Sequence, residues 1–366
     1  MSRYPINRRR FLQHFGLSTG VLASGWAPYL AAKPSRKLGV ALLGLGSYST
    51  GQLAPGLQLT QHCELRGIVT GSPEKIPKWQ ERYGIKDANV YSYETMHRLA
   101  DNPDIDVVYV VTPTGLHKKY AVAAANAGKH VWCEKPMAMN PQECQEIIDA
   151  CRKNRVKLSI GYRMQHEPNT QTIMRFADEK PFGAIERLDV MAAYSGGENR
   201  SSDNWRMKRE LGGGALYDMG VYTINGSRYA TGEEPIAVTA RHETTHPEAF
   251  TEVDSTTHLT LEFPSGAVAE CTTSFVRSGN HLEVSCEKGS YYLRPMSNYT
   301  GVKGATSDGR KLDKTIVDQQ ATQMDDDALA ILQDKPVMVP GEEGMRDIRI
   351  VQAAFKSARE GKRIEL

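Results

Sequence analysis

The chain has 366 residues, which is long for one ordinary domain and about right for two. Hydrophobic residues make up 40% and charged residues 24%, a composition typical of a globular protein with a sizeable core and not of a disordered chain. The formal net charge is only +2, and Lys and Arg are not concentrated in one run beyond residue 40, so the charge gives nucleic-acid binding no support.

The first 32 residues are typical of an export signal. Three consecutive arginines starting at Arg8 precede a mildly apolar stretch that runs from Phe15 to about Ala32. The order N-R-R-R-F-L is similar to a twin-arginine signal, which a receptor reads, and the stretch is too short and polar to span a membrane. We therefore expect cleavage near Ala31, export of the folded protein to the periplasm and no membrane anchor; a basic flexible tail is the alternative.

Six cysteines are scattered along the chain, and none forms a C-x-x-C pair or a His/Cys cluster. We therefore expect neither a metal site nor a redox motif. An even cysteine count in an exported protein would suggest disulfides. Folding in a reducing compartment before export argues against them.

A glycine-rich turn lies between two predicted strands. The apolar run Lys37–Leu43 leads directly into GLGSYS, and a second strand, Glu64–Thr70, follows a helical stretch that Pro55 and Gly56 shorten or break. This is the strand–turn–helix–strand context of a dinucleotide-binding turn.

In that turn Gly44 allows the tight bend, and Gly46 lets the backbone and its N–H groups approach a pyrophosphate. Ser49 stands where a third glycine is usual, which predicts a slightly looser contact between helix and strand. The alternative is an ordinary glycine turn.

Strands and helices continue to alternate up to residue 160, which predicts a doubly wound parallel Rossmann sheet with ligands at the carboxyl ends of its strands. The expected elements are the strand Ile105–Thr112, the helix His117–Ala127 capped by Gly128, the strand His130–Cys133, a helix that Asn140, Pro141 and Glu143 begin, and the strand Lys157–Gly161.

The end of the second strand favours NADP over NAD. NAD enzymes usually carry an acidic residue there for the ribose 2′-hydroxyl. This strand ends in Thr70, followed by Gly71, Ser72 and, three residues later, Lys75. Hydroxyls and an ammonium suit a 2′-phosphate, which a carboxylate would repel. Alone, Lys75 is better explained as a solvated helix lysine.

Three side chains are candidates for the chemistry. Lys135 follows the strand His130–Cys133, at the ligand side of the sheet, and Asp218 and Tyr222 are four apart on a predicted helix and share one face. Oxidation of a sugar needs a base for the hydroxyl proton, and a neighbouring ammonium makes a phenol a better base. Asp218 would orient the lysine and keep it charged. Separately, each has a structural explanation, as a surface lysine, a helix-face acid and a core tyrosine.

Several motifs together resemble the Gfo/Idh/MocA oxidoreductase family, and within it the glucose–fructose and aldose–aldose oxidoreductases. The likeness covers residues 37 to about 360. The motifs are GLGSY, TPTGLH (112–117), AGKHVWCEKP (127–136), GYR (161–163), NWR (204–206) and GGGALYDMGVY (212–222).

The resemblance implies that Lys135 is the catalytic lysine, that Tyr222 accepts and donates the proton, and that Asp218 binds the sugar or positions the lysine. It places Thr70, Ser72, Lys75 and Tyr93 around the 2′-phosphate, and Trp205 and Arg206 in the cleft. The implied cofactor-binding residues are Gly44, Leu45, Gly46, Ser47, Tyr48, Thr70, Gly71, Ser72, Lys75, Tyr93, Thr112, Pro113, His117, Glu134, Lys135, Arg163, Trp205 and Arg206. The implied substrate-binding residues are Lys135, Tyr162, Arg206, Asp218 and Tyr222.

The resemblance also implies a second domain, residues 161–366, with an open-faced and mostly antiparallel sheet that holds the sugar and builds a homodimer or homotetramer. Alternating runs such as His258–Phe263, Ala267–Phe275 and His281–Glu287 agree with that sheet. A final helix, Glu342–Glu360, has apolar residues at helical spacing for packing, and it can return to the first domain. Glucose–fructose oxidoreductase has a long arm after its signal, and here only about residues 33–36 remain for one, which argues against tetramer assembly and against enclosure of the cofactor by an arm.

The implied activity is oxidation of an aldose at C1 to a lactone, with reduction of a second sugar by the same tightly bound NADP(H). A compartment outside the cytoplasm offers no free nucleotide, and two alternating sugars would regenerate the cofactor in place. The alternatives are a simple NAD(P)-dependent aldose dehydrogenase, an exported NAD-dependent glycosidase of the same fold, and a non-catalytic sensing module. The E-K-P lysine argues against the glycosidase, and the complete Lys135, Asp218 and Tyr222 set argues against the sensor.

Overall fold

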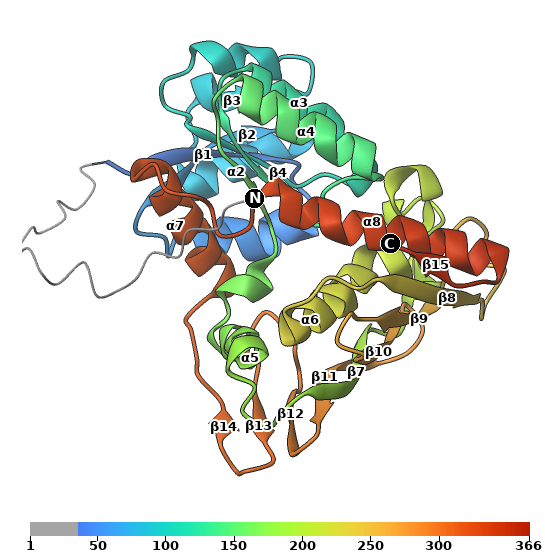
Figure 1. Cartoon of the computed structure of the whole chain (residues 1–366). Coiled ribbons are helices and arrows are strands. Elements are labelled where there is room, and N and C mark those ends of the chain that lie inside the picture. Colours follow the sequence, from blue (N-terminus) through green and yellow to red (C-terminus); the bar gives the residue numbers. More distant parts are fainter. Residues whose placement is uncertain (1–35) are drawn as a thin grey trace, which may run out of the picture. The chain divides into compact units, whose positions relative to one another are not determined.

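Two β-sheets organise residues 36–366, the part of the chain that the computed structural model describes (Figure 1). The export signal expected in residues 1–32 lies outside these residues. Residues 36–366 form one compact unit. Among them, no helix is long and apolar enough to cross a membrane.

The first sheet has six parallel strands in the order β3-β2-β1-β4-β5-β6. The chain order reverses between β1 and β4, which is where ligands bind in sheets of this kind. This is the doubly wound Rossmann arrangement that the sequence predicts. The strands are β1 (Leu38–Leu43), β2 (Cys63–Val69), β3 (Val90–Tyr91), β4 (Val107–Val110), β5 (His130–Cys133) and β6 (Leu158–Ile160).

Helices cover both faces of this sheet. One face packs on α3 (His117–Asn126) and α4 (Pro141–Lys153), the other on α1 (Ala54–Leu57), and α2 (Ile76–Tyr83) follows β2. A late segment, α7 (Gln319–Leu332), lies beside α1 on the second face, where Met324 and Ala328 enter the core. The face is therefore completed by residues from the far end of the chain.

The predicted start of α4 is confirmed. The side chain of Asn140 accepts a hydrogen bond from the backbone N–H of Glu143 at 2.9 Å, and Pro141 is the first helical residue. The carboxylate of Glu143 accepts in return from the backbone N–H of Met139 at 3.1 Å, one residue before the expected partner. These two reciprocal hydrogen bonds fix the start of α4, which follows the loop after β5.

The second sheet has nine strands in the order β14-β13-β12-β11-β7-β10-β9-β8-β15. It is mostly antiparallel, as predicted, but β7 and β10 pair in parallel. The strands are β7 (Ile185–Ala193), β8 (Ala237–Glu243), β9 (Thr256–Glu262), β10 (Val268–Ser274), β11 (Gly279–Cys286), β12 (Gly289–Leu293), β13 (Gly304–Thr306), β14 (Lys311–Leu312) and β15 (Ile364–Glu365).

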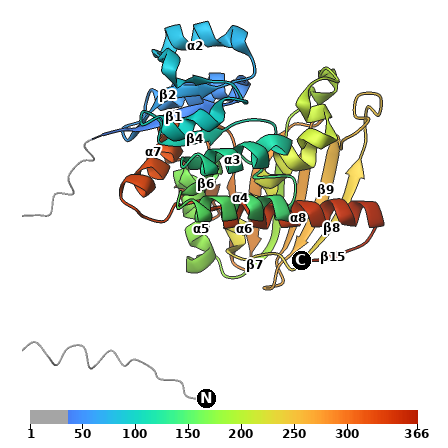
Figure 2. The same ribbon diagram turned by 90° about the horizontal axis from the view of Figure 1, so that it is seen from above.

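Three helices pack beside the second sheet: α5 (Pro168–Glu179), α6 (Val221–Thr231) and α8 (Gly341–Glu360). The last of these lies between β8 and α4 and so contacts both halves of the unit, as both views show (Figures 1 and 2). Its residues Met345, Ile348 and Val351 are buried, which confirms the predicted packing role.

Candidate active site

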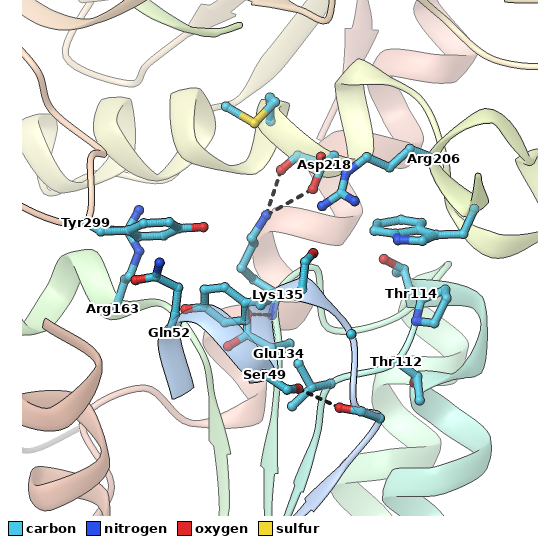
Figure 3. Close-up of a pocket in the computed structure, with 18 of the residues that line it drawn as sticks. Ser49, Gln52, Thr112, Thr114, Glu134, Lys135, Arg163, Arg206, Asp218 and Tyr299 are labelled. Carbon is cyan, nitrogen blue, oxygen red and sulfur yellow. Dashed lines mark hydrogen bonds and ion pairs between the residues drawn. The ribbon is translucent and has the colours of Figure 1, made fainter. Parts of the chain in front are cut away.

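A cavity of about 860 Å³ lies at the carboxyl ends of the first sheet, and residues from β7, β11 and the loops of the second sheet complete its lining (Figure 3). Sixteen of the eighteen residues expected to bind the cofactor line it, and so do Asp218 and Tyr222. The sixteen are Gly44, Leu45, Gly46, Ser47, Tyr48, Thr70, Ser72, Lys75, Tyr93, Thr112, Pro113, Glu134, Lys135, Arg163, Trp205 and Arg206.

The glycine turn after β1 forms one wall. Gly44 has a φ of +98°, and a Cβ there would lie 2.7 Å from the carbonyl oxygen of Val111 on the adjacent strand loop, so only glycine fits. A Cβ on Gly46 would meet nothing within 4 Å, which leaves the backbone there open to the cavity. The turn therefore offers a close approach to a ligand at Gly46.

Ser49 does not loosen this turn, contrary to expectation. Its side chain is fully buried, and its hydroxyl donates a hydrogen bond to the carbonyl oxygen of Gly44 at 2.5 Å (Figure 3). The hydroxyl thus ties the start of the helical segment Ser49–Leu53 to the end of β1. The helical segment continues into α1 and through Pro55, and it ends at Leu57, one residue after Gly56, so the helix is shortened at this point but not broken.

A second wall lies beyond the end of β2 and has no acidic residue. The ammonium of Lys75 donates to the carbonyl oxygen of Leu45 at 3.1 Å, which holds it over the glycine turn. The hydroxyl of Thr70 accepts from the backbone N–H of Ser72 at 3.0 Å. Tyr93 is stacked on Tyr120, which lies outside the cavity, with ring centroids 4.7 Å apart. This corner can receive an anionic group.

The floor of the cavity joins Lys135 to Asp218 and Tyr222. The ammonium of Lys135 lies 2.8 Å from the carbonyl oxygen and 3.3 Å from a carboxylate oxygen of Asp218 (Figure 3). It also lies 4.6 Å from the centroid of the Tyr222 ring. Asp218 is in a helical turn, Leu216–Gly220, that runs into α6, which carries Tyr222. Asp218 and Tyr222 follow Lys135 by 83 and 87 positions in the sequence, and the fold brings them to it as predicted.

On this floor one carboxylate, Asp218, lies between two cations. Burial would raise the pKa of Asp218, but Lys135 and Arg206, whose Nε donates at 2.7 Å, lower the pKa to about 2. Burial would lower the pKa of Lys135, but Tyr222, Asp218 and Glu134 outweigh it and raise the pKa. The lysine is therefore an ammonium and the aspartate a carboxylate at neutral pH.

Three expected ligand-binding residues lie outside the cavity lining. Gly71 backs Tyr93, because a Cβ on it would lie 2.8 Å from that ring. The buried imidazole of His117 bridges the carbonyl oxygens of Thr112 and Pro136 at 2.7 and 2.8 Å, so it fixes two loops of the cavity. Tyr162 is 1% exposed and stands among buried groups behind the floor, where no sugar reaches it. The prediction that Tyr162 binds the substrate is therefore wrong.

The second sheet contributes lining residues that the sequence analysis missed: Tyr194, Arg200, Asn280, Asn298, Tyr299 and Thr300. Tyr299 lies opposite the glycine turn, 5.8 Å from the ring of Tyr48. The guanidinium of Arg163 lies 4.6 Å from the Tyr299 ring and donates to the carbonyl oxygen of Asn298 at 3.1 Å. Asn280 lies in β11 and the other five missed residues lie in loops, and no local motif marks any of the six.

A dinucleotide fits the groups present. The turn is open at Gly46, Lys75 supplies a cation beside it, and the buried hydroxyl of Thr112 has no hydrogen-bond partner within residues 36–366. In the same range, no group of three or more His, Cys, Asp or Glu side chains is placed to hold a metal ion.

Comparison with known proteins agrees with this geometry. Residues 38–162 match a family model described as an oxidoreductase family with an NAD-binding Rossmann fold, and residues 170–292 match the GFO/IDH/MocA C-terminal domain. The crystal structure of aldose–aldose oxidoreductase from Caulobacter crescentus, complexed with glycerol, is similar with 36% identity and a TM-score of 0.86, over 90% of this chain and 100% of that one.

Two further relatives bear on the fold. D-Xylose 1-dehydrogenase [NADP(+)] of Haloarcula marismortui is 27% identical over 330 residues, which cover 87% of this chain and 90% of that protein. The structure of levoglucosan dehydrogenase with NADH and levoglucosan has a TM-score of 0.78 at 21% identity, over 90% of this chain and 99% of that one.

Proposed function

Because the chain belongs to the Gfo/Idh/MocA family of oxidoreductases, we propose that it oxidises and reduces sugars with NADP(H) bound in this cavity. The observation that carries the proposal is the ammonium of Lys135 held between Asp218 and Tyr222 on the cavity floor. Aldoses and xylose in the names of similar proteins support a sugar as substrate.

Each side chain on the cavity floor has its own role in the proposed reaction. Tyr222 takes the proton of the sugar hydroxyl and gives it back in the reverse direction. Lys135 stabilises the negative charge that develops on the phenol and on the sugar oxygen. Asp218 keeps Lys135 charged and aimed, and Arg206 holds Asp218 from the other side. The nicotinamide, when bound, supplies hydride acceptance and donation.

NADP is the proposed cofactor because the corner beyond β2 pairs hydroxyls with the ammonium of Lys75. An anionic 2′-phosphate gains charge-assisted hydrogen bonds there. The acidic lining residues, Glu134 and Asp218, both lie beside Lys135 and not in this corner. The NADP-dependent xylose dehydrogenase among the relatives supports the same choice.

We further propose that the protein works in the periplasm, as a homodimer or homotetramer, with the cofactor retained. One aldose reduces the bound cofactor and leaves as a lactone, and a second sugar then takes the hydride. Such a cycle needs no free nucleotide, which suits an exported protein.

Mass analysis of the nucleotide released from purified protein, followed by turnover with single and paired aldoses, tests this proposal. The expected result is bound NADP(H), turnover of sugar pairs without added nucleotide, and ping-pong kinetics. An apo preparation that turns over only with free NAD(P) would reject the closed cycle and leave a simple aldose dehydrogenase, the function that the xylose dehydrogenase likeness favours.

A further inference from the structure

A row of buried polar side chains lies under the first sheet, on the face that α7 covers. Tyr109, Trp132 and Ser159 are neighbours because they are register partners on β4, β5 and β6. Gln323 and Asp327 are four residues apart on α7 and share one face of that helix. Each of the five is 1% exposed or less. The reaction on the cavity floor uses none of them.

One end of the row reaches the cavity. The hydroxyl of Tyr109 donates to a carboxylate oxygen of Glu134 at 2.7 Å, and Glu134 lines the cavity beside Lys135. The side-chain amide of Gln323 donates to the Tyr109 hydroxyl at 3.0 Å. Burial raises the pKa of Glu134, so this carboxyl is suited to hold a proton in passing.

The other end reaches solvent. The hydroxyl of Ser159 donates to a carboxylate oxygen of Asp327 at 2.6 Å. Burial raises the pKa of Asp327 to about 6, and the nearby imidazole of His166 offsets part of the shift. Nδ1 of His166 lies 2.7 Å from a carboxylate oxygen of Asp326, whose side chain is 40% exposed.

Three atoms of the row and one of the neighbouring His166 are buried without a hydrogen-bond partner within residues 36–366. They are Nε1 of Trp132, Oε1 of Gln323, Oδ2 of Asp327 and Nε2 of His166. Leaving such a group unpaired costs about 1–3 kcal/mol. A buried water usually makes about three hydrogen bonds to such groups. The indole can donate to it, the two oxygens can accept from it, and the imidazole nitrogen can donate or accept.

We propose that these atoms bind internal water and that the filled row is a proton path between Glu134 and Asp326. The inference rests on the proposed function, because the path serves a reaction that releases a proton. Oxidation at C1 sends a hydride to the cofactor and the hydroxyl proton to Tyr222, one proton for each hydride. The proton then crosses the sugar space beside Lys135 to Glu134 and passes through the Tyr109 hydroxyl to the internal water, because the Gln323 amide only donates to that hydroxyl. The water carries it past Asp327 to Asp326, and the reductive half-reaction takes one proton back.

The test follows hydride and proton separately in holoprotein carrying oxidised cofactor, mixed with D-xylose or D-glucose in weak buffer. Nicotinamide absorbance reports the hydride, and a pH indicator reports the proton. The variants are Asp327→Asn, inside the row, and Asp326→Asn, at its exposed end where folding is less at risk. The control is Asp325→Asn on the same helix, whose carboxylate accepts from the backbone N–H groups of Gln61 and His62, a role that asparagine retains.

In wild type and in Asp325→Asn, the proton should appear with the hydride. In both row variants we expect the hydride burst to be unchanged and proton release to be slowed by roughly tenfold or more. Turnover of a sugar pair, which releases no net proton, should be unchanged. Proton release that still keeps pace with the hydride in both variants would overturn the path, whereas no hydride burst in wild type would overturn the proposed function itself.

Discussion

Replacing Asp218 with Asn removes the charge that two partly buried cations share on the cavity floor. The carboxylate lies 3.3 Å from the Lys135 ammonium and 2.7 Å from Nε of Arg206, and its own side chain is 7% exposed. Asparagine keeps the shape and one oxygen acceptor. The substitution therefore removes the negative charge and replaces one acceptor with an amide N–H donor that faces a cation.

The pKa of Asp218 falls from an ordinary 3.8 to about 2 in the folded protein. A lowered pKa means that the ionised side chain stabilises the fold above its ordinary pKa and that this stabilisation is lost as the pH falls through the folded pKa. The shift is worth about 2.5 kcal/mol at 1.36 kcal/mol per pKa unit. Stranding a buried cation costs roughly 3–5 kcal/mol, so we expect Asp218→Asn to lose about 2–4 kcal/mol of unfolding free energy at neutral pH.

Urea denaturation at a series of pH values measures this loss. The gap between wild type and Asp218→Asn should be constant above about pH 5 and should close as the pH falls from about 4 to 2. Asp254→Asn is the control and should lose less. Within residues 36–366 this buried aspartate accepts only from neutral donors, the backbone N–H of Leu216 and the hydroxyl of Thr257. Equal stability of Asp218→Asn and wild type at neutral pH, or a gap that widens in acid, would refute the ion-pair account.

Two further predictions concern the cofactor walls. Gly44→Ala should destabilise the protein by about 1–3 kcal/mol, since φ is +98° and the new Cβ meets the Val111 carbonyl. Gly46→Ala should melt like wild type but bind nucleotide more weakly. Thermal melting combined with nucleotide titration distinguishes the two variants, and equal melting temperatures would contradict the reasoning. Lys75→Ala should weaken NADP binding roughly tenfold and leave NAD binding unchanged, because the lost charge faces the 2′-phosphate. Calorimetry measures both affinities. An equal loss of affinity for both nucleotides would mean that the Lys75 ammonium does not face the 2′-phosphate.

The first half of the fold follows from the sequence, because its signals are local. Apolar runs bounded by glycine and proline place β1, β2, β4, β5 and β6 within three residues of the observed bounds. The start of α4 is specified by Asn140, Pro141 and Glu143 within one turn. Lys135 was placed at the ligand side simply because it follows a parallel strand.

The rest depends on contacts between distant residues. α7 begins 159 residues after the end of β6 (Gln319 against Ile160) and completes the core of the first sheet, and no pattern in its own sequence indicates that partner. Tyr299 and Asn298 reach the cavity from the loop between β12 and β13. A shift of one residue in the pairing of either strand would change which side chains of this loop face the ligand. The looser contact expected at Ser49 was wrong because the Ser49 hydroxyl supplies a hydrogen bond that a glycine cannot make.

The claim that Tyr222 exchanges the proton beside Lys135 is tested most directly by the rate of hydride transfer in a Tyr222→Phe variant. Holoprotein with oxidised cofactor is mixed with an aldose, and a single turnover is followed by nicotinamide absorbance. The account predicts that the rate falls roughly 10²–10⁴-fold while bound nucleotide and melting temperature stay near wild type. A phenylalanine variant that transfers hydride as fast as wild type would contradict it.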